Sequence, residues 1–201
     1  MEKVAIIKYN AGNIRSVLFA LERLGVPATV TDDAEAIQQA SHVIFPGVGA
    51  ANSAMPYLQQ RGLDMLIKNL QQPFLGICLG MQLMCRHSEE GNTPCLGLFD
   101  IAVKKFPEVV PGAQLALKIP HMGWNALQQM RSPLLQGLPP ESYVYFVHSY
   151  YAELSNYTIA EAVHGVPFSA CLHRDNFYGV QFHTEKSADI GEQILRNFLA
   201  L

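Results

Sequence analysis

The sequence is poor in cysteine and has no Cys-x-x-Cys pair. The 201 residues include only four cysteines, at positions 78, 85, 95 and 171. Domains built on disulfides are much richer in cysteine, and zinc sites of the finger type need closely spaced pairs. We therefore expect free thiols in a reducing compartment, the cytoplasm, and no structural zinc. Nothing else in the sequence requires a metal or a cofactor.

The sequence also lacks a strong charge of one sign and a long apolar run. Seventeen acidic and 14 basic residues give a net charge of −3, so no broad field attracts nucleic acid or an anionic membrane. The longest uncharged apolar stretch, Pro73 to Cys85, is shorter than the roughly 20 residues that span a bilayer. The first ten residues, interrupted by Lys8, resemble a strand and not a signal peptide. We expect no nucleic-acid or membrane partner.

What is present is enough apolar material for a substantial core. The composition, 49% hydrophobic and 15% charged, is that of an ordinary globular protein. No internal repeat, low-complexity tract or long linker divides the chain. We expect one domain over residues 1–201.

The order of apolar runs predicts an α/β fold. In the first half, expected strands at 4–9, 28–31, 42–45 and 73–77 alternate with expected helices from about 13 to 24, at 34–39 and at 54–70. This alternation predicts a mostly parallel central sheet flanked by helices on both faces. After about Gly91, proline is frequent and β-type runs follow closely at 98–103, 143–151, 157–163, 168–172 and 177–182. We expect these to add antiparallel strands, before an amphipathic helix at 189–199.

A cysteine lies where the fourth strand should turn into a helix. The segment 74–82 reads Phe-Leu-Gly-Ile-Cys-Leu-Gly-Met-Gln, so Gly76 and Gly80 flank Cys78 two residues away on each side. This is the pattern of a nucleophile elbow, a tight strand-to-helix turn in which larger flanking side chains would collide. A lone cysteine in an apolar run is more often a buried core residue. The paired glycines favour a nucleophile instead, and the other three cysteines have no such flanks.

A cysteine nucleophile needs a base, because a free thiol with a pKa near ~8.5 is mostly protonated at neutral pH. Of seven histidines, His183 alone has an acid at a useful spacing, Glu185. If the strand from Phe177 continued through both residues, their side chains would point to the same face. The carboxylate would then orient one ring nitrogen while the other faced the sulfur.

These motifs are similar to those of a known family. The block at 76–82 with His-x-Glu at 183–185 resembles the class I, triad-type glutamine amidotransferases. Pro-Gly-Val-Gly at 46–49, Pro-His-Met-Gly-Trp-Asn at 120–125 and His-Thr-Glu-Lys-Ser at 183–187 resemble the glutaminase subunits of imidazole glycerol phosphate synthase within that family. The resemblance covers essentially the whole chain and implies a flavodoxin-like fold.

The resemblance implies a role for each matching residue. Cys78 would attack the side-chain amide carbon of glutamine, His183 would move the proton and Glu185 would orient His183. A γ-glutamyl thioester and ammonia form, and water then releases glutamate. Backbone N–H groups of Leu79 and of Val48 or Gly49 are the candidate oxyanion donors, each such donor being worth a factor of ~10²–10³ in turnover. The residues expected to hold the amino acid head group are Gly49, Gln82, Ser149 and Tyr150. For the last two, the alternative is a strand residue and a packing aromatic.

The resemblance also implies a partner. In that family ammonia passes to a cyclase subunit with a (β/α)₈ barrel, which forms imidazole glycerol phosphate and aminoimidazole carboxamide ribotide in histidine biosynthesis. This chain shows no phosphate-binding loop for the nucleotide substrate, as expected of the ammonia-producing half of a heterodimer. The residues expected to face the partner are His121, Met122, Trp124, Lys186 and the loop from Asn10 to Asn13. For Trp124 the alternative is a place in the core.

Other functions stay open at this stage. The chain could serve a different amidotransferase, or be a stand-alone cysteine hydrolase or peptidase, which would turn over without a partner. A third alternative is a catalytically dead binding module, against which the intact Cys78, His183 and Glu185 argue. Glutaminase assays with and without a barrel partner would separate these alternatives.

Overall fold

Residues 3–10 and 13–201 are described by the structure, a computed structural model, and they form a central sheet, a second sheet and a two-stranded ribbon. The central sheet has the order β11-β12-β13-β4-β3-β1-β2. The five strands from β13 to β2 are parallel to their neighbours, while β12 and β11 run antiparallel. The α/β class and the added antiparallel strands are thus confirmed. The strands of this sheet are β1 (Val4–Ile7), β2 (Ala28–Thr31), β3 (His42–Phe45), β4 (Phe74–Ile77), β11 (Thr158–His164), β12 (Val166–Arg174) and β13 (Phe177–Val180).

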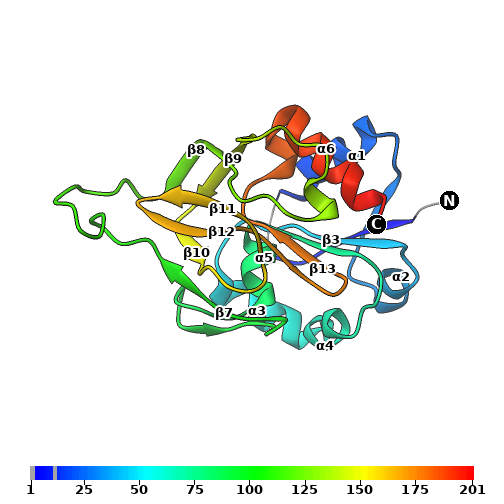
Figure 1. Cartoon of the computed structure of the whole chain (residues 1–201). Helices are drawn as coiled ribbons and strands as arrows, with labels where there is room; N and C mark the ends of the chain where they lie inside the picture. Colours follow the sequence, from blue (N-terminus) through cyan, green and yellow to red (C-terminus); the bar gives the residue numbers. More distant parts are fainter. Residues whose placement is uncertain (1–2, 11–12) are drawn as a thin grey trace.

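The second sheet and the ribbon lie toward the end of the molecule where the parallel strands finish (Figure 1). The second sheet, in the order β10-β7-β5-β6, is formed by β5 (Cys85–Ser88), β6 (Thr93–Pro94), β7 (Phe99–Lys105) and β10 (Tyr150–Ala152). The antiparallel ribbon joins β8 (His121–Ala126) to β9 (Tyr143–His148). Residues between β7 and β8 extend away from the body at the same end. Of these elements, β5, β6 and β8 have no counterpart among the expected strands.

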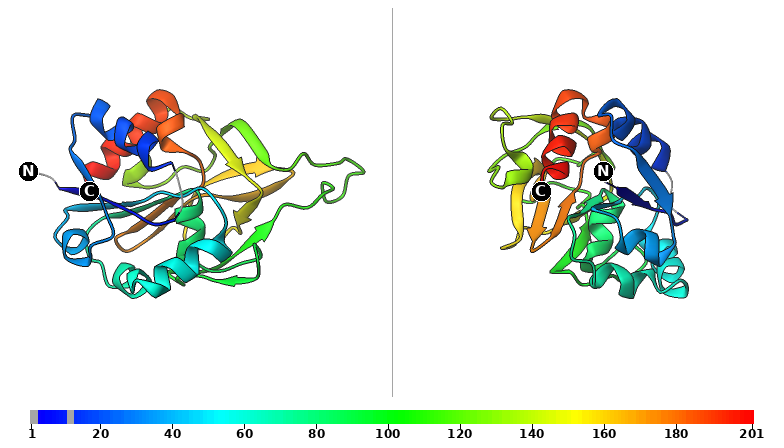
Figure 2. Two further views of the ribbon diagram at one scale, coloured as in Figure 1. Left: turned by 180° about the vertical axis from the view of Figure 1, so that it is seen from behind. Right: turned by 90° about the vertical axis from the view of Figure 1, so that its right-hand side faces the viewer.

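Helices cover both faces of the central sheet, because its strands are apolar on both sides. Val4 and Ile6 of β1 pack in one buried cluster with α1 and α6, whereas Ala5 and Ile7 pack in the other with α2 to α5. The views in Figures 1 and 2 show α1 and α6 on one side of the sheet and α3 and α4 on the other. The helices are α1 (Ile14–Arg23), α2 (Ala34–Gln38), α3 (Ala51–Gln60), α4 (Leu63–Lys68), α5 (Leu79–Met84) and α6 (Ala188–Leu199), with 3-10 turns η1 (Pro133–Leu135) and η2 (Thr184–Lys186). None of the helices in the described part of the chain is both long and apolar enough to cross a membrane.

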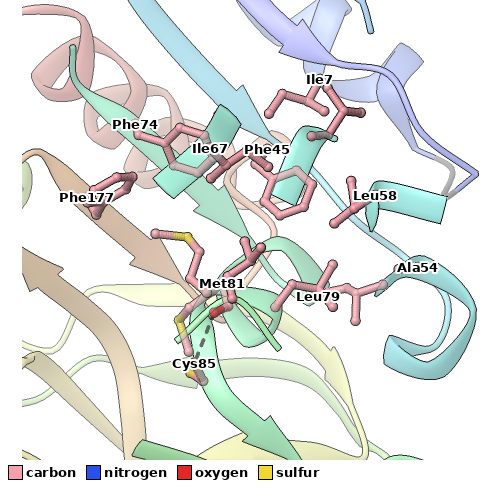
Figure 3. Packing of buried hydrophobic residues seen from close by; sticks show 14 of the residues in the cluster. Ile7, Phe45, Ala54, Leu58, Ile67, Phe74, Leu79, Met81, Cys85 and Phe177 are labelled. Carbon is pink, nitrogen blue, oxygen red and sulfur yellow. Dashed lines mark hydrogen bonds between the residues drawn. The ribbon is translucent and has the colours of Figure 1, made fainter. Parts of the chain in front are cut away.

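The core beneath α3 and α4 fixes the middle of the sheet. Phe74 of β4 lies between Phe45 of β3 and Phe177 of β13, with ring centroids 5.9 and 5.5 Å apart. Leu58 and Ile67 cover these rings from the helices (Figure 3). All five side chains are buried. The strand that leads to Cys78 is therefore held on both sides by aromatic packing.

Two expected elements are broken in the structure. The single helix expected at 54–70 is two helices, α3 and α4, because Gly62 between them adopts a left-handed conformation (φ 64°) that turns the chain. The expected strand at 143–151 splits at Ser149 into β9 and β10, which belong to different sheets. Apolar periodicity does not reveal either break, since a turn within a buried run keeps its apolar character.

Candidate functional site

Cys78 lies at the turn between β4 and α5, at the end of a central strand of the sheet. Its backbone has φ 53° and ψ −110°, a conformation that side-chain-bearing residues rarely adopt. The flanking glycines allow α5 to start against the sheet. A Cβ on Gly76 would lie 2.8 Å from the amide nitrogen of Met81, and one on Gly80 would overlap the carbonyl oxygen of Phe45. The expected elbow is thus present, and its glycines make room for the helix backbone.

Strand pairing brings His183 to the same edge of the sheet. β13 pairs in parallel with β4, Ile77 faces Val180, and the Cys78 N–H donates to the Val180 carbonyl over 2.8 Å. The strand ends there, so the expectation that it continues to Glu185 is wrong. At His183 the chain leaves the sheet and enters the short 3-10 helix η2, which leads into α6. The imidazole and the carboxylate nevertheless meet, with Nδ1 of His183 2.8 Å from Oε1 of Glu185.

Both members of this pair are almost completely buried, with side chains 2% and 1% exposed. Burial acts to lower the pKa of His183, but hydrogen bonding and charge from Cys78 and Glu185 outweigh it and raise the pKa to about 10. Nδ1 of His183 is held by Glu185, and among the described residues Nε2 has no other hydrogen-bond partner than the Cys78 sulfur beside it. The nitrogen opposite the carboxylate is therefore available to a proton shared with the sulfur. An imidazolium beside Cys78 favours the thiolate form of that cysteine.

A cavity of about 360 Å³ opens in front of Cys78. Every residue expected to bind the oxyanion or the glutamine head group lines this cavity, namely Val48, Gly49, Leu79, Gln82, Ser149 and Tyr150. Glu90, Pro120, Val147 and His148 line it as well and were not expected from the sequence. Glu90 is the clearest omission, since among the described lining residues it alone carries a carboxylate. Only its place after β5, a strand that the sequence did not indicate, brings it to the cavity.

The expected oxyanion donors are arranged around a backbone hydrogen bond between the start of α5 and the 46–49 segment. The backbone N–H of Leu79 donates to the carbonyl oxygen of Gly47 over 3.3 Å. Gly49 has φ 122°, a conformation suited to glycine. In this conformation the Leu79 N–H is therefore occupied by a carbonyl of the Pro-Gly-Val-Gly segment. It becomes available to a ligand only if Gly47 turns away.

The residues expected at a partner surface divide into two groups. Met122 and Trp124 of β8 are 60% and 53% exposed, which excludes a core position for Trp124. Trp124 lies edge-on to Tyr145, and the Lys186 ammonium lies 5.9 Å from the centre of the same ring. We call Met122, Trp124, Tyr145 and Lys186 the β8–β9 patch. Side chains alternate along a strand, so β8 exposes Met122 and Trp124 on one face and turns the side chains of its other face inward.

The second group does not point outward. His121 is buried between the ribbon and the sheet, so the expectation that it faces a partner is wrong. Its Nδ1 lies 2.9 Å from Nε2 of His148, and its ring stacks on His164 at 4.3 Å. Burial, aided by the charge of His164, lowers the pKa of His121 to about 4. Asn13, also expected at the partner surface, is half-buried and bonds to Glu185. Ala11 and Gly12 of that loop lie outside the described residues.

A parallel α/β sheet with a cysteine elbow beside a buried His–Glu pair is the arrangement of a triad-type cysteine hydrolase. The chain belongs to the class-I glutamine amidotransferase family, whose family model matches residues 5–201. It is 58% identical over 199 residues to the imidazole glycerol phosphate synthase subunit HisH of Bacteroides thetaiotaomicron, covering 99% of this chain and 100% of the relative. It is 48% identical over 202 residues to the HisH subunit of Xanthomonas campestris pv. campestris, covering 100% of this chain and 98% of that one.

Solved structures show the same fold at lower sequence similarity. A crystal structure titled as a glutamine amidotransferase covers 98% of this chain and 97% of its own, with a TM-score of 0.69 and 17% identity. A glutamine amidotransferase from Thermotoga maritima covers 92% and 76%, with a TM-score of 0.63 and 16% identity. At these identities the likeness concerns the fold alone.

Proposed function

We propose that this chain is the glutaminase subunit of an imidazole glycerol phosphate synthase, releasing ammonia from glutamine for histidine biosynthesis. The single observation that carries the chemistry is the hydrogen bonding of His183 with Cys78 on one side and Glu185 on the other, at the ends of two adjacent strands. The family and the full-length HisH relatives supply the reaction. The placement of Cys78, His183 and Glu185 supports them as the catalytic triad.

The proposed reaction has two halves. The Cys78 sulfur attacks the side-chain amide carbon of glutamine, and the tetrahedral intermediate collapses as His183 gives its proton to the leaving nitrogen. This yields a γ-glutamyl thioester and ammonia. His183, now neutral, takes a proton from water, whose oxygen attacks the thioester and releases glutamate and the thiolate. Glu185 holds the imidazole through Nδ1, so that Nε2 carries the transferred proton.

Charge and hydrogen-bonding capacity in the cavity fit the head group of glutamine. Glu90 supplies a carboxylate for the α-ammonium group, while its Oε2 also accepts from the Ala51 N–H over 2.8 Å. Both side-chain N–H donors of Gln82 are engaged, with the Tyr150 carbonyl and with Gln181. Only the carbonyl oxygen of Gln82 therefore remains for a ligand. We assign the oxyanion to Leu79 with Val48 or Gly49, and the head group to Gly49, Gln82, Ser149 and Tyr150.

The proposed partner is a cyclase subunit with a (β/α)₈ barrel, forming a heterodimer with this chain. The name of the HisH relatives describes a subunit, so a partner subunit is part of the function. The β8–β9 patch supports a docking surface, because tryptophan and methionine are enriched at interface centres and both are exposed here. Lys186 follows Glu185 directly, so a partner on this patch would lie next to the triad.

We also propose that the chain is one amidotransferase domain over residues 1–201 and that it works in the cytoplasm. All four cysteines are free thiols, although two of them, Cys85 and Cys171, are fully buried. Free thiols are typical of a reducing compartment.

The proposal is tested by Cys78→Ala with Cys95→Ala as its matched control, because Cys95 is a half-buried thiol outside the cavity. Each variant is purified with the cyclase subunit, and imidazole glycerol phosphate formation is measured with glutamine or with ammonium salt. Cys78→Ala should lose the reaction with glutamine and keep it with ammonium, while Cys95→Ala keeps both. Glutamine-dependent turnover by Cys78→Ala would overturn the nucleophile. Full glutaminase activity without the cyclase would favour a stand-alone hydrolase.

A further inference from the structure

Gln181 is a fully buried polar residue (0% exposed) next to the nucleophile. It follows β13 directly, and its backbone N–H donates to the Ala170 carbonyl over 2.8 Å, continuing the pairing with β12. The parallel register that places Ile77 opposite Val180 also places Cys78 beside Gln181. The side-chain Nε2 of Gln181 lies 3.7 Å from Sγ of Cys78, within reach of an N–H···S hydrogen bond.

The direction of this hydrogen bond is fixed by a chain of neighbours. Nε2 of Gln82 lies 2.8 Å from the Tyr150 carbonyl oxygen, which can only accept. The same NH₂ group lies 2.9 Å from Oε1 of Gln181. With its oxygen turned to Gln82, the amide of Gln181 must turn its NH₂ group to the sulfur. The Tyr150 backbone carbonyl at the cavity wall thus fixes the donor and acceptor direction of every hydrogen bond from Gln82 to Cys78.

A buried donor aimed at the sulfur stabilises the thiolate more than the thiol. A hydrogen bond to an ionised acceptor is roughly twice as strong as one between neutral groups. It also restricts where the sulfur can point, since the second amide of the chain, Gln82, is anchored at the cavity. The reaction mechanism derived from the triad alone makes no use of this donor.

We propose that Gln181 is a positioning residue for the nucleophile, holding the Cys78 sulfur through its side-chain amide and linking it through Gln82 to the wall of the substrate cavity. The inference rests on the proposed function, in which Cys78 attacks glutamine. It adds to that function a side-chain amide donor to the sulfur, directly after the strand that leads to His183; the sulfur also lies 4.0 Å from the Val147 carbonyl oxygen, which can only accept.

Other titratable groups also face the sulfur or its cavity. These are Tyr9 at the end of β1, His183 before η2, Glu90 after β5 and His148 at the end of β9. Burial, with a smaller contribution from the charge on Cys78, raises the pKa of Tyr9, so it stays a neutral phenol. Tyr9 donates to the Pro46 carbonyl over 2.7 Å and does not compete for the sulfur. A test of Gln181 must therefore leave these groups in place.

The test is Gln181→Met, which keeps the length of the side chain and removes both amide donors. The matched control is Gln72→Met, because Gln72 is half-buried, donates to the Ile37 carbonyl over 2.9 Å and lies at the other end of β4. Alkylation of Cys78 by iodoacetamide is followed against pH in the full chain. At pH values below the wild-type midpoint, Gln181→Met should react about tenfold more slowly, because the midpoint of its profile should move up by about one pH unit. Gln72→Met should keep the wild-type profile.

Two further measurements keep the outcome decisive. In complex with the cyclase, kcat for glutamine should fall about tenfold in Gln181→Met while KM stays within about twofold. In the wild-type chain, the side-chain NH₂ signals of Gln181 should shift with the same pH midpoint as alkylation of Cys78, a readout that needs no variant to fold.

An unchanged alkylation midpoint together with pH-independent NH₂ signals would overturn the proposal. So would a variant that loses thermal stability and activity equally at every pH, the sign of a purely structural role. Failure of the wild-type complex to release ammonia from glutamine would instead overturn the proposed function.

Discussion

The side chain of Asn13 donates a 2.5 Å hydrogen bond to Oε1 of Glu185, the same oxygen that lies against Nδ1 of His183. The Ser16 hydroxyl in turn donates to the side-chain Oδ1 of Asn13 over 2.5 Å. The start of α1 therefore fixes the carboxylate that orients the imidazole, from a segment 172 positions away in the sequence. A shift of this loop would be felt directly at His183.

Replacing Asn13 with alanine should slow turnover without weakening glutamine binding. Loss of a hydrogen bond to a charged group is worth a factor of about 10 to 100 in kcat, because Glu185 is then free to rotate. Steady-state kinetics of the complex with glutamine measure this, and ammonium-dependent cyclisation reports an intact partner. Asn69→Ala removes a comparable amide, which donates to the Met65 carbonyl on α4, and should leave kcat unchanged. Wild-type kcat in Asn13→Ala would show that Glu185 needs no such support.

Glu90→Gln should raise KM for glutamine about 10- to 100-fold with a smaller change in kcat, because it removes the negative charge that we propose to face the α-ammonium group and keeps an acceptor for the Ala51 N–H. Glu89→Gln is the matched control. Glu89 is exposed, lies outside the cavity and accepts from the Lys105 N–H over 2.7 Å. Equal KM values for the two variants would place the ammonium group elsewhere.

Trp124→Ala should weaken binding of the cyclase subunit about 30-fold or more, since a central tryptophan is often worth at least ~2 kcal/mol at an interface. Titration calorimetry of the two purified subunits gives the affinity. Met65→Ala removes another exposed side chain, 59% exposed on α4 and remote from the β8–β9 patch, and should bind as wild type does. Full affinity in Trp124→Ala would exclude the patch as the docking surface.

Lowering the pH should destabilise the fold through His148. Burial lowers its pKa from 6.5 to about 3, so between these values the unfolded chain binds a proton that the folded chain does not. The stability due to His148 is therefore complete above pH 6.5 and falls by about 1.4 kcal/mol per pH unit below it. Urea unfolding from neutral pH to about pH 5 measures the slope. His148→Gln should reduce the slope and leave the part that comes from His121, whose pKa is also lowered, to about 4. His87→Gln leaves His148 in place and should keep the full slope. An unaltered slope in His148→Gln would assign acid sensitivity to other groups.

How much of the site was predictable depended on how local the constraint is. Gly76 and Gly80 act within one turn, so the sequence alone indicated the elbow at Cys78. The His183–Glu185 pair was also indicated, although the continuous strand expected there ends at Val180. Gln181 is an ordinary polar residue whose importance comes from the pairing of β13 with β4, a strand distant in sequence. Glu90 lies in the β5–β6 hairpin, and its importance comes from the contact of that hairpin with Ala51. The burial of the His121 side chain was not predicted, because the sequence did not indicate β8.

The hydrogen bond between Leu79 and Gly47 could control when glutamine is hydrolysed. In the proposed mechanism the Leu79 N–H is an oxyanion donor, and while it donates to the Gly47 carbonyl the tetrahedral intermediate lacks that donor, so bound glutamine should be hydrolysed slowly. At 3.3 Å this bond is long and inexpensive to break. A small rearrangement of the 46–49 segment, such as docking of a substrate-bound cyclase subunit could cause, would free the Leu79 N–H for the oxyanion. Glutamine would then be hydrolysed only when the cyclase subunit holds a substrate that can accept the ammonia.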